Sequence, residues 1–203
     1  NYRDSTVINA LYNTLHDINE YDSTITTHNL LLGLLDIKTY QDIETITNRL
    51  NMHLTIHQND IRAYLILGNL YFDVKNYFDS MTYYFHAELI DRNNIHAKYY
   101  LALSLIGLEK YEDALLKLNE IIILDKYNYL ARFHAGKLYL MFNEYSLAEK
   151  ILTDALLINS NDDNIYYYLG VAYRKQGKNK QALDAFKESI NLNPSNGDAH
   201  YAL

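Results

Sequence analysis

The chain of 203 residues contains no cysteine and no tryptophan, one proline and seven glycines. Without cysteine it can form no disulfide framework, no reactive thiolate and no cysteine-based zinc site. The glycines form no phosphate-binding cluster, which argues against a nucleotide-binding loop. No run of about 18 apolar residues is present, so we expect no direct insertion into a membrane.

The chain also lacks an excess of basic residues, since its formal net charge is −7. Proteins that bind nucleic acids carry a basic stripe or patch, so no nucleic-acid partner is expected. Residues 1–60 hold eight acidic and three basic residues, which we interpret as a solvated acidic face, with a basic partner segment as the alternative. The absence of cysteine leans towards a cytoplasmic location, although a targeting segment can lie outside this chain.

From Ile61 onward, residues that are 34 positions apart share the same character. This spacing, with apolar residues at helical intervals, predicts consecutive pairs of helices. Tyr77, Tyr111, Tyr145 and Asn179 are expected to begin the second helices. Two columns hold small residues and a third holds large ones: Gly68, Ala102, Gly136 and Gly170; Ser80, Ala114, Ala148 and Ala182; Tyr84, Leu118, Leu152 and Phe186.

The last full pair, in residues 164–194, shows the pattern most clearly. Its first helix carries Tyr166, Leu169, Gly170 and Tyr173 on one face, Gly177 follows as a helix-ending residue, and the second helix carries Ala182 and Phe186 before Pro194. This arrangement resembles the tetratricopeptide repeat, with Tyr166 in the place of the family's tryptophan. The resemblance implies an all-α fold, a right-handed α-solenoid of stacked antiparallel helix pairs in which each repeat contacts the next.

The period also suggests how the chain is divided. We predict full repeats at 61–94, 95–128, 129–162 and 163–196, a degenerate repeat at 24–60, an N-terminal helix in 1–23 from a truncated repeat, and the start of a further repeat or capping helix at 197–203. Helices are expected over 5–20 and 28–37. Aligning Tyr40 with Tyr77 gives a spacing of 37, so we expect an extra turn or a longer loop around 53–60.

Members of this family bind other polypeptides in a concave groove lined by the first helices, and the resemblance implies such a scaffold here. The ligand would be an extended or helical segment with apolar anchors, centred on Tyr99, Leu103 and Phe133. Alternatives are an array appended to a catalytic domain, a self-assembling homo-oligomer, and simple packing of these residues against the adjacent helix. The implied groove residues are Leu65, Asn69, Phe72, Tyr99, Leu103, Ile106, Phe133, Lys137, Leu140, Tyr167, Val171 and Arg174.

Some members of the family grip a carboxy-terminal carboxylate with a clamp of lysine, asparagine and arginine. The corresponding positions here lack both clamp cations, so this mode is rejected; they hold Leu65, Asn69, Tyr100, Leu130 and His134. His53 and His57 lie four positions apart but have no third metal ligand at motif spacing, and we interpret them as a surface pair. We therefore expect no catalytic residue, no metal, no cofactor and no enzymatic activity.

Overall fold

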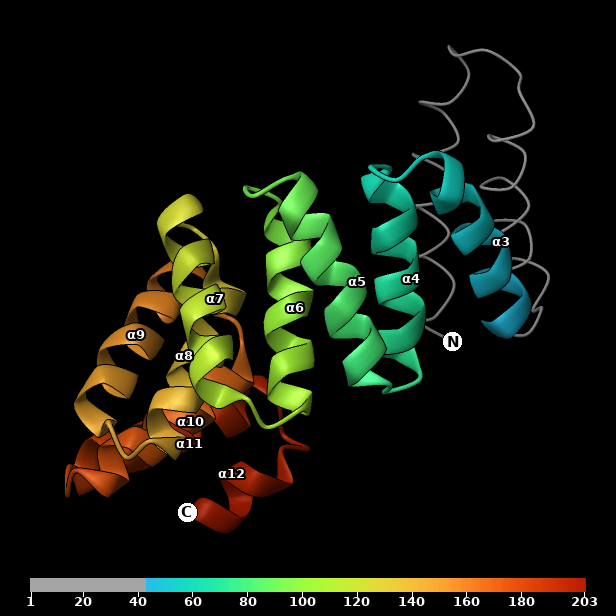
Figure 1. Cartoon of the computed structure of the whole chain (residues 1–203). Helices are drawn as coiled ribbons and strands as arrows, with labels where there is room; N and C mark the ends of the chain where they lie inside the picture. Colours follow the sequence, from blue (N-terminus) through green and yellow to red (C-terminus); the bar gives the residue numbers. More distant parts are fainter. Residues whose placement is uncertain (1–42) are drawn as a thin grey trace. The chain divides into compact units, whose positions relative to one another are not determined.

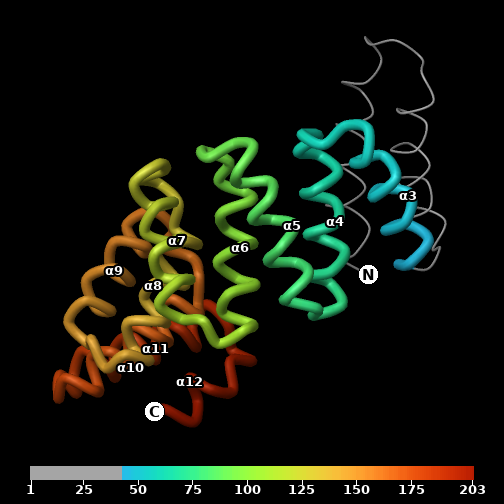
Figure 2. The backbone as a smooth tube through the Cα atoms, viewed as in Figure 1, coloured from blue at the N-terminus to red at the C-terminus, as the bar shows by residue number. Residues whose placement is uncertain are grey.

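The computed structural model describes residues 43–203, in which every regular element is a helix (Figures 1 and 2). The predicted all-α fold of consecutive helix pairs is confirmed, whereas the helices expected over 5–20 and 28–37 lie outside the described residues. The described chain forms two compact units, 43–92 and 93–203, and each is treated by itself.

The first unit contains α3 (Ile43–Ile56), α4 (Ile61–Asp73) and α5 (Tyr77–Ile90). Helix α4 packs against both of its neighbours. The core between α3 and α4 is built from Ile46, Leu50, Ala63 and Leu67.

The second unit contains seven helices, each packed against the next, and α8 also contacts α10. The second helices begin at the predicted residues, and α12 begins where a further first helix was expected. The helices are α6 (Ile95–Gly107), α7 (Tyr111–Leu124), α8 (Tyr129–Met141), α9 (Tyr145–Ile158), α10 (Asp163–Lys175), α11 (Asn179–Leu192) and α12 (Gly197–Ala202).

The prediction of an extra turn or a longer loop around 53–60 is wrong. Helix α3 ends at Ile56, and residues 57–60 connect it to α4 just as residues 91–94 follow α5. Leu50 and Tyr84, which are 34 positions apart, are both fully buried. Helix α3 therefore keeps the same period, and the expectation failed because Tyr40 is not the counterpart of Tyr77.

The two helices of a pair approach closely because a small residue on the first faces a large side chain on the second. A Cβ atom built on Gly136 would lie 2.6 Å from Cδ2 of Leu152, and one built on Gly170 would lie 2.6 Å from Cε1 of Phe186. In the first unit, Gly68 faces the Tyr84 ring in the same way. Glycine at these three positions therefore allows the two helices of each pair to lie close together.

Every first helix ends in the same left-handed turn, although only one of these turns contains glycine. The turn residues are Lys75, Glu109, Asn143 and Gly177, with φ of 61°, 60°, 61° and 74°. The amide after each of them donates back across the turn, as from Lys110 to the Leu105 carbonyl at 2.9 Å. This pair of features is the Schellman ending of a helix.

Every first helix also begins with a side-chain cap. Asn128 Oδ1 accepts from the amide of Ala131 at 3.0 Å, which satisfies one of the free amides at the start of α8. The capping residues are spaced by 34 positions: Asp60, Asn94, Asn128, Asp162 and Asn196.

Gly136→Ala provides a test of the close approach. Alanine is the better helix former by about 1 kcal/mol, so helix propensity alone predicts stabilisation. Because the new methyl group would overlap Leu152, we expect a net loss of about 1–3 kcal/mol in the free energy of unfolding. Urea unfolding followed by circular dichroism measures this. Gly197→Ala is the control, since nothing lies within 4 Å of its Cβ position; a stabilised Gly136→Ala protein would contradict the packing.

Candidate functional site

A continuous series of aromatic rings crosses three first helices of the second unit. We call it the aromatic ladder; its members are His96, Tyr99 and Tyr100 of α6, Phe133 and His134 of α8, and Tyr167 and Tyr168 of α10. Two contacts join neighbouring helices: Tyr99 to His134, with centroids 5.7 Å apart, and Phe133 to Tyr168, 5.6 Å apart. Both contacts are edge-to-face, which is a favoured geometry for aromatic pairs.

The period of the sequence explains why the rings meet. Each of the three first helices carries two adjacent rings at equivalent positions, so stacking the helices brings a ring of one beside a ring of the next. One ring of each pair was predicted from the sequence to line the binding groove, namely Tyr99, Phe133 and Tyr167. The second ring of each pair was not predicted to bind a ligand, although the spacing of 34 positions relates these rings too: Tyr100, His134 and Tyr168.

Lys137, another of the predicted groove residues, lies against two rings of the ladder. Its Nζ atom is 5.5 Å from the Phe133 centroid and 5.0 Å from the Tyr168 centroid, which is within the range of a cation–π contact. Arg174, at the end of α10, is exposed and places its guanidinium 5.4 Å from the centroid of Phe186, whose ring also contacts Tyr167.

The other predicted residues serve in part for packing. Phe133 and Leu140 are half-buried and pack against the core around Leu152. In the first unit, Asn69 accepts a hydrogen bond from the Tyr84 hydroxyl, and Phe72 contacts Tyr77 edge-on. The rest are half-buried on their first helices: Leu65, Leu103, Ile106 and Val171.

Burial favours the uncharged forms of two rings in the ladder, Tyr99 and His134. It raises the pKa of Tyr99 to about 12, with the neighbouring Tyr100 and Tyr129 adding to the effect. It also lowers the pKa of His134 to about 4, helped by the positive charge of Lys137. At neutral pH the Tyr99 phenol is therefore protonated and the imidazole of His134 is neutral, and neither ring offsets the charge of Lys137.

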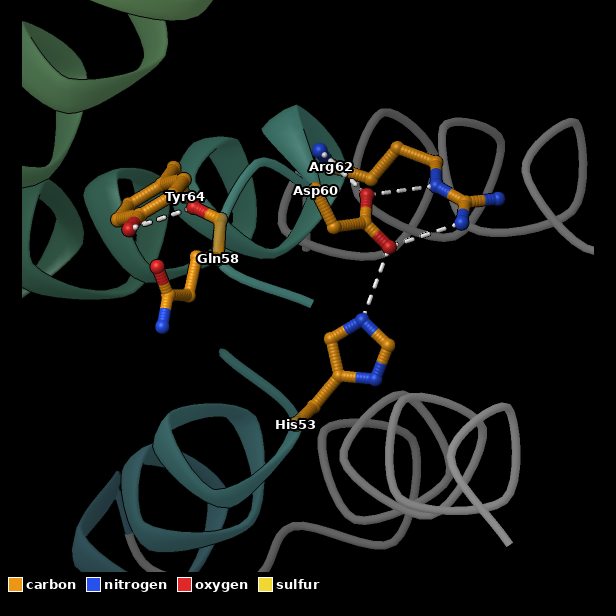
Figure 3. A network of polar contacts seen from close by, with 5 residues as sticks. All are labelled: His53, Gln58, Asp60, Arg62 and Tyr64. Atoms are coloured by element: carbon orange, nitrogen blue, oxygen red, sulfur yellow. Dashed lines mark hydrogen bonds and ion pairs between the residues drawn. The ribbon is translucent and has the colours of Figure 1, made fainter. Parts of the chain in front are cut away.

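A second cluster of polar side chains joins α3 to α4 (Figure 3). The Asp60 carboxylate accepts from Nε2 of His53 at 2.9 Å and from Nε and Nη2 of Arg62 at 2.9 and 2.8 Å, while it also caps α4. Burial alone would raise the pKa of Asp60. The hydrogen bonds from Arg62 and His53, together with the charge of Arg62, outweigh that effect and hold the pKa at about 2.

The interpretation of His53 and His57 as a surface pair is wrong for His53, which is 2% exposed. It occupies the column of second-helix residues that are buried throughout the array, namely Ala87, Ile121, Ala155 and Ser189. Within residues 43–203 there is no group of three His, Cys, Asp or Glu side chains that could hold a metal ion. No helix in that range is long and apolar enough to cross a membrane.

Comparison with known proteins identifies the repeat. The family model of the tetratricopeptide repeat matches residues 164–196, which span α10, α11 and the turn that ends at Asn196. Residues 164–196 form a tetratricopeptide repeat. The solved structure of YrrB, described as a tetratricopeptide repeat protein with an unusual peptide-binding site, is 19% identical with a TM-score of 0.77, over 98% of this chain and 97% of that one.

A crystal structure of the MamA protein is similar to this chain at 21% identity and a TM-score of 0.77, over 88% of this chain and 96% of that one. At these identities the likeness establishes the fold. Among curated human proteins, RANBP2-like and GRIP domain-containing protein 1 is 31% identical over 71 residues, which is 35% of this chain and 4% of that protein. The E3 SUMO-protein ligase RanBP2 is 29% identical over 66 residues, which is 32% of this chain and 2% of that protein.

Asp60→Asn tests the polar cluster. Because the pKa of Asp60 lies below its ordinary value of 3.8, its ion pair stabilises the fold above that pH, and the contribution is lost as the pH falls towards 2. We expect Asp60→Asn to lower the free energy of unfolding at neutral pH by about 1–2 kcal/mol. The deficit should shrink as the pH falls from 3.8 to about 2.

Asp162→Asn is the matched control for this experiment. Asp162 caps α10 through the amide of Asn164, as Asp60 caps α4, but no Arg or His side chain among the described residues bonds to it. Asparagine caps helices as well as aspartate does, so the control should change stability little. An equal loss in both variants, or a deficit in Asp60→Asn that does not depend on pH, would contradict the assignment.

Proposed function

We propose that this protein is a non-catalytic interaction scaffold that binds a polypeptide segment across the aromatic ladder. The observation that carries the proposal is the unbroken contact of seven rings over α6, α8 and α10. Most of these rings are only half-buried, so their outer parts are open to a ligand. We take the full repeats of the scaffold to be residues 61–94, 95–128, 129–162 and 163–196.

Physical chemistry favours binding at such a surface. Tyrosine and phenylalanine bring a large contact area with few rotatable bonds, and aromatic residues are enriched at the energetic centres of interfaces. The ladder spans three helices, so an extended or helical segment could contact successive repeats with successive apolar side chains. The solved structure of YrrB, a repeat protein described as having a peptide-binding site, supports the same class of ligand.

The test uses a displayed library of short random peptides, selected on the whole chain in solution. We expect Tyr99→Ala with Tyr167→Ala to weaken binding of the selected peptides by about tenfold or more. Phe133 is left intact because it also packs against the core. Fluorescence anisotropy measures the affinity, and circular dichroism checks that the helix content is unchanged.

Ile123→Ala with Leu157→Ala is the matched control, since both side chains are 82% exposed on second helices. This pair should leave peptide binding unaltered. If no peptide is enriched, or if the selected peptides bind the Tyr99 and Tyr167 variant as well as the unchanged protein, the ladder is not the binding surface.

Self-assembly is a second candidate function, and it rests on a different surface. Within the second unit, Ile123 and Leu157 stand 34 positions apart on the second helices α7 and α9, and both are 82% exposed. Exposed apolar side chains that recur in this way favour a contact with another protein.

Light scattering over a concentration series tests self-assembly. We expect the mass of particles to rise with concentration for the unchanged chain and to stay at that of a monomer for Ile123→Ser with Leu157→Ser. The ladder variant, Tyr99→Ala with Tyr167→Ala, should assemble like the unchanged chain. A monomer at every concentration would contradict this second candidate.

A further inference from the structure

The ladder contains one positive charge for which the described part of the chain supplies no carboxylate. Three other lysines of the second unit pair with carboxylates: Lys98 and Lys117 with Glu120, and Lys178 with Glu149. Nζ of Lys137 instead lies against the faces of Phe133 and Tyr168. Contact with two rings leaves the outer side of an ammonium group able to donate hydrogen bonds to an anion.

The charges of the second unit are separated between its two kinds of helix. The first helices α6, α8 and α10 carry five basic residues and one acidic residue: Lys98, Arg132, Lys137, Arg174 and Lys175 against Asp163. The second helices α7, α9 and α11 carry four basic and seven acidic residues. The three helices that carry the ladder are therefore net basic in a chain whose formal net charge is −7.

Two acidic groups, Asp163 and Asp198, lie at the α10 end of the ladder. Asp163 already accepts hydrogen bonds from the side-chain amides of Asn193 and Asn196, at 2.9 and 2.8 Å. Asp198 of α12 acts on Tyr167, whose pKa is raised by burial first and by this carboxylate second, while Arg174 acts in the opposite direction. At the centre of the ladder, between Tyr99 and Tyr168, the charge of Lys137 is the one that a ligand meets.

We propose that the segment bound by the ladder is acidic, with a carboxylate that pairs with Lys137 and apolar side chains that cover the rings on either side of it. This inference rests on the proposed function and adds the chemistry of the partner. The partner is a peptide rather than a nucleic acid, because a phosphate backbone is held by several basic residues along its path and this face offers few.

The experiment continues from the peptides selected on the whole chain. Aspartate and glutamate should be enriched among them beside apolar residues. The best peptide is then compared with its counterpart in which Asp and Glu are replaced by Asn and Gln. We expect Lys137→Met to weaken binding of the acidic peptide by about tenfold, as expected for loss of a charge-assisted hydrogen bond, and to leave binding of the amide counterpart within about twofold.

Lys150→Met is the matched control, because Lys150 is an exposed lysine on the second helix α9. It should leave the affinities for both peptides unchanged. Raising the salt concentration should weaken binding of the acidic peptide more than binding of its amide counterpart, since salt screens exposed ion pairs.

The outcomes separate this inference from the proposed function. If selected peptides need Tyr99 and Tyr167 but are neutral or basic, or if Lys137→Met weakens both peptides equally, the acidic partner is overturned while the peptide scaffold stands. If short oligouridine binds as tightly as the best peptide, the face is one for nucleic acid and both proposals are overturned. If no peptide is enriched, the proposed function fails, and this inference fails with it.

Discussion

The structure depends on one contact, between a small residue on each first helix and a large side chain on the helix that follows it. Gly136 against Leu152 and Gly170 against Phe186 leave no room for a Cβ atom on the first helix. The helices therefore lie as close as their backbones allow, and the large side chains are fully enclosed. Close packing of this kind leaves little room for added atoms, which is why glycine or alanine recurs at this position of the first helices.

Local structure reinforces the same period. Each first helix starts with an aspartate or asparagine cap and ends in a left-handed turn, and both features recur every 34 positions. The backbone has a positive φ at Lys75, Glu109 and Asn143. Residues other than glycine adopt this conformation at a cost in free energy. The Schellman hydrogen bonds and the packing of the pair hold these residues in that conformation.

Because the inner side of each first helix is used for packing, its remaining side can carry functional residues. In the second unit that side holds the aromatic ladder and Lys137, while acidic residues concentrate on the second helices. Burial raises the pKa of Tyr99 and lowers that of His134, so both rings are uncharged at neutral pH and lie beside a cation for which the described residues supply no carboxylate. These properties suit a ligand that is both acidic and apolar.

The sequence by itself determined the helix pairs, the starting residues of the second helices and the columns of small residues, because a period of 34 repeats the same positions in each pair. It also pointed to Tyr99, Phe133, Tyr167 and Lys137. Only the tertiary structure decided that Tyr100, His134 and Tyr168 complete the ladder, since ring contacts between α6, α8 and α10 depend on how neighbouring helices stack. The burial of His53 and the free charge of Lys137 were decided there for the same reason: both depend on partners distant in the sequence.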